Sequence, residues 1–322
     1  MKDPIELARV VDTADGSMQK RRRALVFRGP QRGQGIGTMM KGFATALHIG
    51  GRFGRHVCVS WAAFEAGFQL DTSPCPLKHE LFSHSDHESA MTTFMNPHNI
   101  IELWSFGHRD TLDARAHGLL ASNETIVVMH GDGGTEADAA VRMPFPVTPR
   151  PVLQPLLQPA FELVIHLRAG DPHEAAHRGL FSDGSATASL LASLPKAAYV
   201  LTDSDEVHGA LCPSYTCPSW GVVPHSSYRE LAPAGHADER QRHATRTLRT
   251  WADWWAIRTA SHVLHTPSAF SESALTFSNA TGCVLRDVQS LHRCVLALPP
   301  LRDTVRAGGS AEGEDAGRDE LR

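Results

Sequence analysis

The chain has 322 residues, of which 42% are hydrophobic and 20% are charged, the composition of a soluble globular protein. This length exceeds one ordinary hydrophobic core and favours two domains of roughly 120–150 residues each. The net charge of -4 shows no basic excess that would indicate a nucleic-acid partner, and no apolar stretch is long enough to span a membrane. The N-terminus has no signal-peptide pattern. We therefore expect a cytoplasmic protein or, if an N-terminal anchor has been lost, a protein of the Golgi or ER lumen.

The cysteines give a mild hint of an oxidising compartment. Cys212 and Cys217 are close in sequence, as are Cys283 and Cys294, so two short-range disulfides are possible. The spacing of these residues does not match the paired C-x-x-C pattern of zinc sites. Two N-x-T glycosylation sequons point in the same direction as the cysteines.

The first half opens with a βαβ pattern. A polar arm at residues 1–23 precedes a strand at 24–27, a glycine-rich turn at 29–37, a helix at about 38–49 and a second strand at 56–61. The turn satisfies neither the dinucleotide fingerprint nor the P-loop motif. It is interpreted either as backbone that approaches an anion at a helix N-terminus or as a plain tight turn.

The rest of the first half is less regular. Residues 62–125 show little periodicity and would supply an acceptor surface, and a strand is expected at 125–130. Six prolines between residues 144 and 159 indicate a linker, because proline resists both helices and central strands. We therefore place a first Rossmann-like domain at 24–150.

The second half repeats the α/β alternation and is expected to form a second Rossmann-like domain at 151–302. Its strands are predicted at 163–168, 198–201 and 262–265, and each runs into a polar turn. Parallel strands of an open α/β sheet end at one edge, where ligands bind. The polar turns therefore predict a ligand site.

The helices of this half are less sharply defined. A helical stretch is expected near 185–194, and residues 246–260 have the spacing of a helix with one aromatic face. The intervening segment 212–245 is interpreted as a loop-rich insertion. A further helix passes through 274–277, and the Gly-, Asp- and Glu-rich tail at 303–322 is expected to be disordered.

The first of these strand ends carries the chemistry. Its segment 163–168 is a continuous apolar run, as in a buried parallel strand, and ends at Arg168. The planar guanidinium group of arginine matches the oxygens of a phosphate. The alternative is an arginine paired with a surface carboxylate.

Four segments, in this order, carry a resemblance to a known superfamily. They are Gly33-Gln34-Gly35-Ile36-Gly37, His166-Leu167-Arg168-Ala169-Gly170-Asp171, Tyr199-Val200-Leu201-Thr202-Asp203-Ser204, and the stretch from Asp253 to Phe270. The chain resembles the fucosyltransferase superfamily that includes α1,6-fucosyltransferases, protein O-fucosyltransferases and nodulation fucosyltransferases. The resemblance implies a GT-B fold, in which two Rossmann-like domains hold parallel sheets facing each other across a cleft.

The resemblance also implies a reaction. Fucose would pass from GDP-fucose, the donor substrate, to a hydroxyl of a glycan or protein, with inversion and without a metal ion or other cofactor. Arg168 would bind the β-phosphate, and His166 would lie against the nucleotide. Ser268 and the backbone amides after it would hold phosphate oxygens. Across the cleft, the same diphosphate would meet the glycine turn, that is Gly33, Gly35 and Gly37.

Three carboxylates complete the predicted site. Asp203 and Asp253 would accept hydrogen bonds from the ribose or guanine, and Glu174 would be the general base. Each has an ordinary alternative: a helix or strand cap for the two aspartates and a solvated loop residue for Glu174. His166, likewise, has the alternative of a core histidine.

Departures from the family pattern leave two rival hypotheses. Ala169, Pro172 and Ala269 stand where family members carry an arginine, a lysine and a serine, so the chain is alternatively an inactive protein that binds nucleotide or glycan. The second rival is a metallohydrolase, whose ligands would be His166, His173 and His177 with Asp171.

Overall fold

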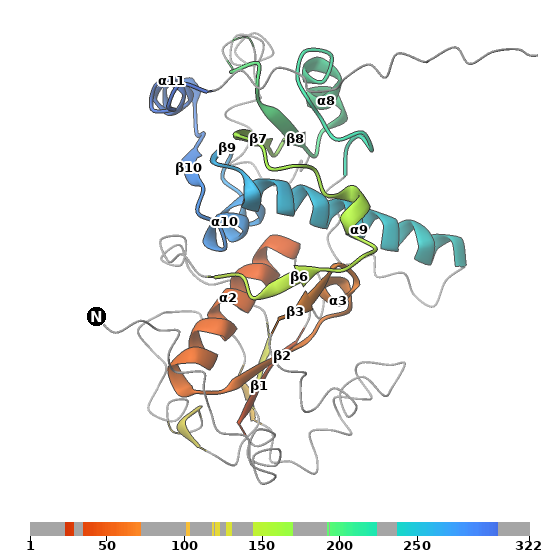
Figure 1. Cartoon of the computed structure of the whole chain (residues 1–322), viewed down its shortest axis with the longest axis vertical. Helices are drawn as coiled ribbons and strands as arrows, with labels where there is room; N and C mark the ends of the chain where they lie inside the picture. Colours follow the sequence, from red (N-terminus) through yellow and green to blue (C-terminus); the bar gives the residue numbers. More distant parts are fainter. Residues whose placement is uncertain are drawn as a thin grey trace, which may run out of the picture.

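The computed structural model describes residues 23–28, 35–71, 101–103, 118, 120–122, 127–130, 144–169, 192, 194–223 and 237–301. Four parts of the chain lie wholly or mostly outside these residues: the polar arm up to residue 22, the tail from residue 302, most of the predicted helix near 185–194 and most of the segment 62–125. Within the described part, the protein is a mixed α/β structure with two four-stranded parallel sheets, one from each half of the chain (Figure 1).

The first sheet has the strand order β2-β1-β5-β4, and all its neighbouring strands are parallel. The strands are β1 (Ala24–Arg28), β2 (His56–Ser60), β4 (Ile101–Leu103) and β5 (Val127–His130). The strands predicted at 24–27, 56–61 and 125–130 are thereby confirmed. The described side chains of β1, residues 24–27, are fully buried, as expected for a central strand of a parallel sheet.

Helix α2 (Ile36–Phe53) connects β1 to β2 and confirms the predicted βαβ unit. It buries one apolar face, which includes Met39, Met40 and Phe43. The helix ends at Gly54, whose φ of 60° lies in the left-handed region, and the N–H of Gly54 donates to the carbonyls of Gly50 and Gly51. Glycine adopts this conformation without the steric cost that a side chain adds, so the residue type fixes the end of the helix.

The second sheet has the strand order β10-β9-β7-β8, again entirely parallel. Its strands are β7 (Leu163–Leu167), β8 (Tyr199–Thr202), β9 (His262–His265) and β10 (Thr281–Val284). The helices of this half are α8 (Asp205–Leu211), α9 (Ala237–Thr259), α10 (Ala269–Thr276) and α11 (Val288–Leu296). Every residue of β7 is buried, in agreement with its continuous apolar sequence.

Two predictions for the connecting segments are wrong. The loop-rich insertion was expected to reach residue 245, but α9 already begins at Ala237. The proline-rich stretch is not a free linker: it forms β6 (Val147–Pro149) and a 3-10 helix at Gln154–Leu156. Strand β6 pairs antiparallel with β3 (Phe68–Leu70), which follows α3 (Ala62–Gly67). Pro149 is tolerated because it lies at the end of a strand in a two-stranded sheet, where few ladder hydrogen bonds are lost.

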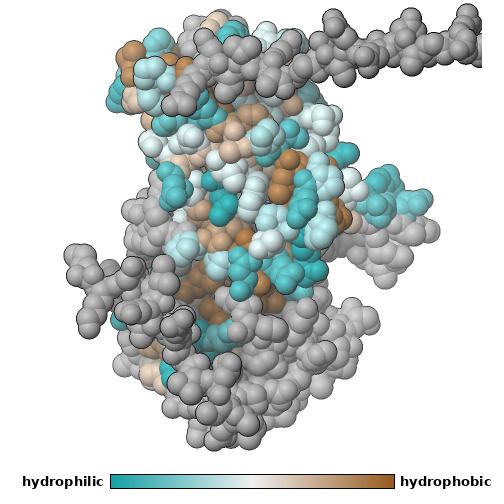
Figure 2. Space-filling model, viewed as in Figure 1, coloured by the Kyte–Doolittle hydropathy of each residue, from teal (hydrophilic) through white to brown (hydrophobic). Residues whose placement is uncertain are grey.

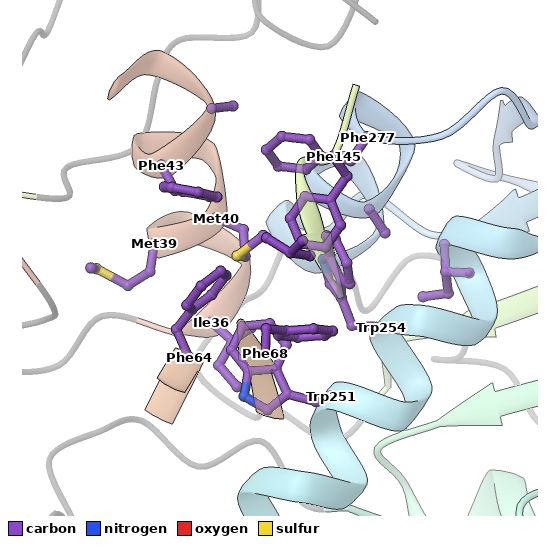
Figure 3. Packing of buried hydrophobic residues seen from close by; sticks show 14 of the residues in the cluster. Ile36, Met39, Met40, Phe43, Phe64, Phe68, Phe145, Trp251, Trp254 and Phe277 are labelled. Carbon is purple, nitrogen blue, oxygen red and sulfur yellow. The ribbon is translucent and has the colours of Figure 1, made fainter. Parts of the chain in front are cut away.

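One aromatic cluster joins the two halves (Figure 3). The Phe68 ring of the first half lies 5.0 Å from the Trp251 ring of α9. The Phe145 ring lies 4.7 Å from Phe277 and 5.1 Å from Trp254. Aromatic pairs at such distances stabilise a fold by about 0.5–1.5 kcal/mol beyond their area burial. The two sheets are therefore held in a fixed relation by a shared core.

The described cysteines are all in disulfide bonds. Both predicted short-range pairs, Cys212–Cys217 and Cys283–Cys294, are confirmed. Polar and apolar side chains are mixed over the described part of the face in Figure 2. None of the helices in the described ranges combines the length and the hydrophobicity needed to cross a lipid bilayer.

Candidate functional site

The ends of three parallel strands of the second sheet come together, as the sequence predicts. Arg168 follows β7, Asp203 follows β8 and Thr266 follows β9. The backbone N–H of Arg168 donates to Thr266 Oγ1 over 2.8 Å, and the N–H of Ala169 donates to Asp203 Oδ1 over 2.7 Å. These two hydrogen bonds tie the segment after β7 to both neighbouring strand ends. The direction of the Arg168 main chain is therefore fixed by its surroundings.

Arg168 and His166 are both buried at this edge, with 8% and 7% of their surfaces exposed. Burial lowers the pKa of His166 to about 4; the carboxylate of Asp203 opposes the shift, and His265 and Arg168 add to it. The imidazole of His166 is thus neutral near pH 7. Its Nδ1 lies 2.5 Å from Ser271 Oγ in α10. A neutral histidine beside Arg168 leaves the guanidinium as the cation at the end of β7.

Two helix N-termini, one from each half, meet close to this edge. Helix α10 has Ser268 as its N-cap, and the Ser268 hydroxyl accepts a hydrogen bond from Phe270 N–H over 3.2 Å. Helix α2 has Gly35 as its N-cap and therefore has no side-chain cap. A Cβ atom added at Gly37 would lie 2.3 Å from the backbone N of Phe270. The first turns of the two helices are therefore in backbone contact, and both present their positive dipole ends to the same region.

A salt bridge also connects α2 and α10, about one helical turn after their N-termini. Lys41 Nζ of α2 forms a salt bridge with Glu272 Oε2 of α10, and both side chains are largely shielded from solvent. His265, at the end of β9, lies near this pair. Burial lowers the pKa of His265, Glu272 raises it and Lys41 lowers it. The ion pair therefore contributes to holding the α2 N-terminus in place against α10.

Asp253 lies apart from these groups. It belongs to α9 and its neighbours are Tyr199 and Trp220. Burial raises the pKa of Asp253 well above its usual value, while the indole N–H of Trp220 opposes the rise. Burial and the charge of Asp253 also raise the pKa of Tyr199. Tyr199 starts β8 whereas Asp203 follows its end, so the structure groups Asp253 with the opposite end of that strand.

The structure brings together most of the site residues expected from sequence. Gly35, Gly37, His166, Arg168, Asp203 and Ser268 lie at the strand ends or at the two helix N-termini beside them. Gly33 and Glu174 lie outside the described residues, as do His173, His177 and Asp171 of the metallohydrolase hypothesis.

Sequence reasoning missed three side chains at this edge: Ser271, Lys41 and Glu272. The sequence could have pointed to Lys41, because it is a charged residue between Met40 and Gly42, which are both buried in α2. Its partner is 231 residues further along the chain, and no periodicity connects residues so far apart. Ser271 carried no signal beyond its place in the first turn of α10.

Solved structures with a similar chain path include fucosyltransferases. FUT1 from Arabidopsis thaliana, a mutant in complex with GDP, is 11% identical, with a TM-score of 0.48 over 88% of this chain and 77% of its own. NodZ alpha-1,6-fucosyltransferase soaked with GDP-fucose is 14% identical, with a TM-score of 0.42 over 80% and 92% of the two chains. NodZ from Bradyrhizobium is also 14% identical, with a TM-score of 0.41 over 78% and 92%. No model of a protein family and no curated protein matches the chain.

All three identities are below 15%, and all three TM-scores are below 0.5. The function proposed below rests on the residues at the strand ends.

Proposed function

We propose that the protein is a glycosyltransferase that binds GDP-fucose between its two halves and transfers fucose to a hydroxyl of a glycan or protein. The observation that carries this proposal is the convergence of Arg168 with two helix N-termini contributed by different halves. A diphosphate requires a cation and several N–H donors at short range. The proposal includes a GT-B arrangement of the two sheets, with the donor bound at the carboxyl edge of the second one.

The diphosphate would be held from both sides. Arg168 would bind the β-phosphate, Ser268 and the amides after it would bind phosphate oxygens, and Gly35 and Gly37 would let the α2 backbone approach from the first half. His166 would form a hydrogen bond with the nucleotide, either as donor or as acceptor. Its imidazole is neutral near pH 7 because its pKa is lowered to about 4. The donor is taken to be GDP-fucose because four segments of the chain resemble fucosyltransferases.

Asp203 would have two roles. Its Oδ1 already accepts the hydrogen bond from Ala169 N–H, which orders the turn after Arg168. Its second oxygen, Oδ2, would accept a hydrogen bond from the ribose. The first role is structural and the second is a contact with the donor, so substitutions that keep one oxygen acceptor distinguish them.

The transfer would proceed with inversion and without a metal ion. The acceptor oxygen attacks the anomeric carbon of fucose as the bond from that carbon to the phosphate oxygen breaks, and GDP leaves with the electron pair. The hydroxyl proton passes to a general base, for which we propose Glu174. Arg168 and the helix N–H donors stabilise the charge that develops on the leaving phosphate. Removal of one such donor typically costs about 3–4 kcal/mol in the barrier.

Transfer from GDP-fucose to a panel of glycan and peptide acceptors, measured beside calorimetric GDP binding, tests this function. We expect GDP binding and transfer that both persist in EDTA. GDP binding without transfer or donor hydrolysis would favour the inactive binding protein. Ala169 and Ala269 motivate this alternative, because they stand where members of the resembled family carry an arginine and a serine. Activity that EDTA abolishes would instead favour a metal-dependent reaction.

A further inference from the structure

A second cluster of reactive side chains lies at the far end of α8 from the candidate site. The helix has Ser204, the residue after Asp203, as its N-cap and Cys212 as its C-cap. His208, Cys212 and Cys217 gather at this end, and their ligand atoms all lie within 4.8 Å of one another. Among the described residues, no other group of three His, Cys, Asp or Glu side chains comes this close.

The spacing in sequence explains the geometry. His208 and Cys212 are four residues apart, so they share one face of a helical turn, and the N–H of Cys212 donates to the carbonyl of His208 over 2.9 Å. Cys217 lies five residues after Cys212 in the sequence and is joined to it by a disulfide. Spacings of three or four intervening residues between ligands are typical of structural zinc sites.

His208 supplies an independent observation that points to metal binding. Its Nε2 is buried, and it has no hydrogen-bond partner among the residues that the structure describes. A buried ring nitrogen without a partner is unusual, because such atoms normally find a donor, an acceptor or a metal ion. The two sulfurs beside it, once reduced, are ligands of the kind that zinc prefers together with imidazole.

The backbone around the cluster is also held by hydrogen bonds that do not involve the disulfide. The N–H of Tyr215 donates to Leu211 O over 3.1 Å, which closes the turn after α8. Thr216 pairs with Tyr199 in a parallel bridge, and the N–H of Val200 donates to Thr216 O over 2.8 Å. Cys217 is therefore anchored to β8 through its neighbour, so the two thiols stay close to His208 after the disulfide is opened.

We propose that His208, Cys212 and Cys217 form a zinc site in the reduced protein, and that the Cys212–Cys217 disulfide is the oxidised, metal-free state of the same site. A dithiol reductant transfers two electrons and two protons to the disulfide and becomes a disulfide itself. Zn²⁺ then displaces the two thiol protons and binds both thiolates and His208 Nε2, with water as the fourth ligand. Zn–S bonds of about 2.3 Å in a tetrahedron place the ligand atoms roughly 3.5–3.8 Å apart, so the two sulfurs, now 2.02 Å apart in the disulfide, must separate while all three ligand atoms stay within the present 4.8 Å.

The test uses the full chain, reduced with a phosphine, desalted under nitrogen and titrated with Zn²⁺ against a chromophoric chelator, and with Co²⁺ as a spectroscopic probe. We expect one tightly bound Zn²⁺ that the oxidised protein does not bind. Bound Co²⁺ should show the thiolate charge-transfer and intense visible bands of a tetrahedral site. His208→Ala should weaken Zn²⁺ binding by roughly a hundredfold, since even the loss of an outer-shell partner of a metal ligand costs 10–100-fold.

The matched control is the double variant Cys283→Ser with Cys294→Ser, because this disulfide belongs to no comparable group among the described residues. It should bind Zn²⁺ as the wild type does. The proposal is overturned if reduced wild-type protein binds no Zn²⁺, if His208→Ala and His208→Gln both bind it as tightly as the wild type, or if the control variant loses the site. Thermal unfolding of the oxidised variants checks that each one is folded.

Discussion

Substitution of Gly37 by alanine tests whether α2 and α10 are in the close contact that the site requires. Gly37 is the second residue of α2, and a Cβ atom there would lie 2.3 Å from Phe270 N and 2.4 Å from Ala269 C. Both are backbone atoms of the other half, so no side-chain rotation relieves the overlap. The first turn of α2 must move away from α10, and the N–H donors that face the proposed diphosphate must move with it.

The size of the effect follows from two opposing contributions. Forcing one extra carbon into a packed contact costs about 1–3 kcal/mol. Alanine in place of glycine favours a helix by at most about 1 kcal/mol, and by less in its first turn. We therefore expect a net loss of about 1–2 kcal/mol in the free energy of unfolding, a fall in Tm of roughly 2–8 °C. GDP binding should weaken roughly tenfold, the equivalent of about 1.4 kcal/mol.

Gly51→Ala is the matched control. Gly51 belongs to the same helix, is exposed, and would meet no atom within 4 Å if it carried a Cβ. This variant keeps the gain in helix propensity without the clash, so we expect it to be more stable by about 0.5–1 kcal/mol and to bind GDP normally. Differential scanning calorimetry and GDP titration measure both quantities. A Gly37→Ala protein that matched Gly51→Ala in Tm and in GDP affinity would refute the contact between the helices.

Three further predictions concern groups around Arg168. Because burial lowers the folded-state pKa of His166 to about 4, below its ordinary value of 6.5, the unfolded chain binds the additional proton and stability falls as the pH drops from 6.5 towards 4. Denaturant titrations should show that His166→Gln removes about 1–2 kcal/mol of the loss between pH 7 and pH 5; an unchanged pH dependence would contradict the assigned burial. For the Lys41–Glu272 salt bridge, a double-mutant cycle with Lys41→Met and Glu272→Gln should give a coupling of roughly 0.5–3 kcal/mol in unfolding, whereas additive single variants would mean that the pair does not fasten the helices. Asp203→Asn keeps an acceptor for Ala169 N–H and should retain most of the GDP affinity that Asp203→Ala loses. Equal GDP affinities in the two variants would mean that the hydrogen bond from Ala169 to Asp203 does not position Arg168.

Local sequence patterns were sufficient to predict the elements that build the site. The apolar run before Arg168 and the strand–glycine–helix–strand pattern around Gly37 each reflect a period or a turn that neighbouring residues set among themselves. Parallel pairing then brings the strand ends to one edge, a rule that applies to any open α/β sheet. For this reason the grouping of Arg168, Asp203 and Ser268 was accessible without coordinates.

The features that sequence reasoning missed depend on long-range packing. The first nine residues of α9 are polar except for Ala237 and Ala244 and show no apolar period, yet they belong to a helix whose later turns bury Trp251 and Trp254. Ala, Glu, Gln and Arg favour a helix once such a nucleus exists. The proline-rich stretch is ordered because Phe145 enters the aromatic core and Val147 pairs with Leu70. The position of Asp253 beside Tyr199 likewise depends on how α9 crosses the sheet, which its own sequence does not specify.

Calorimetric titration of GDP into wild-type protein, Arg168→Ala and Arg168→Lys tests the central claim most directly, which is that the guanidinium at the end of β7 binds a nucleoside diphosphate. We expect the wild type to bind GDP, Arg168→Ala to bind it roughly a hundredfold more weakly, and Arg168→Lys to show an intermediate loss, because an ammonium group keeps the charge but not the planar pair of donors. In the transfer assay, Arg168→Ala should lose activity by a similar or larger factor while remaining folded. If Arg168→Ala bound GDP and turned over as the wild type does, Arg168 would not be the group that binds the diphosphate.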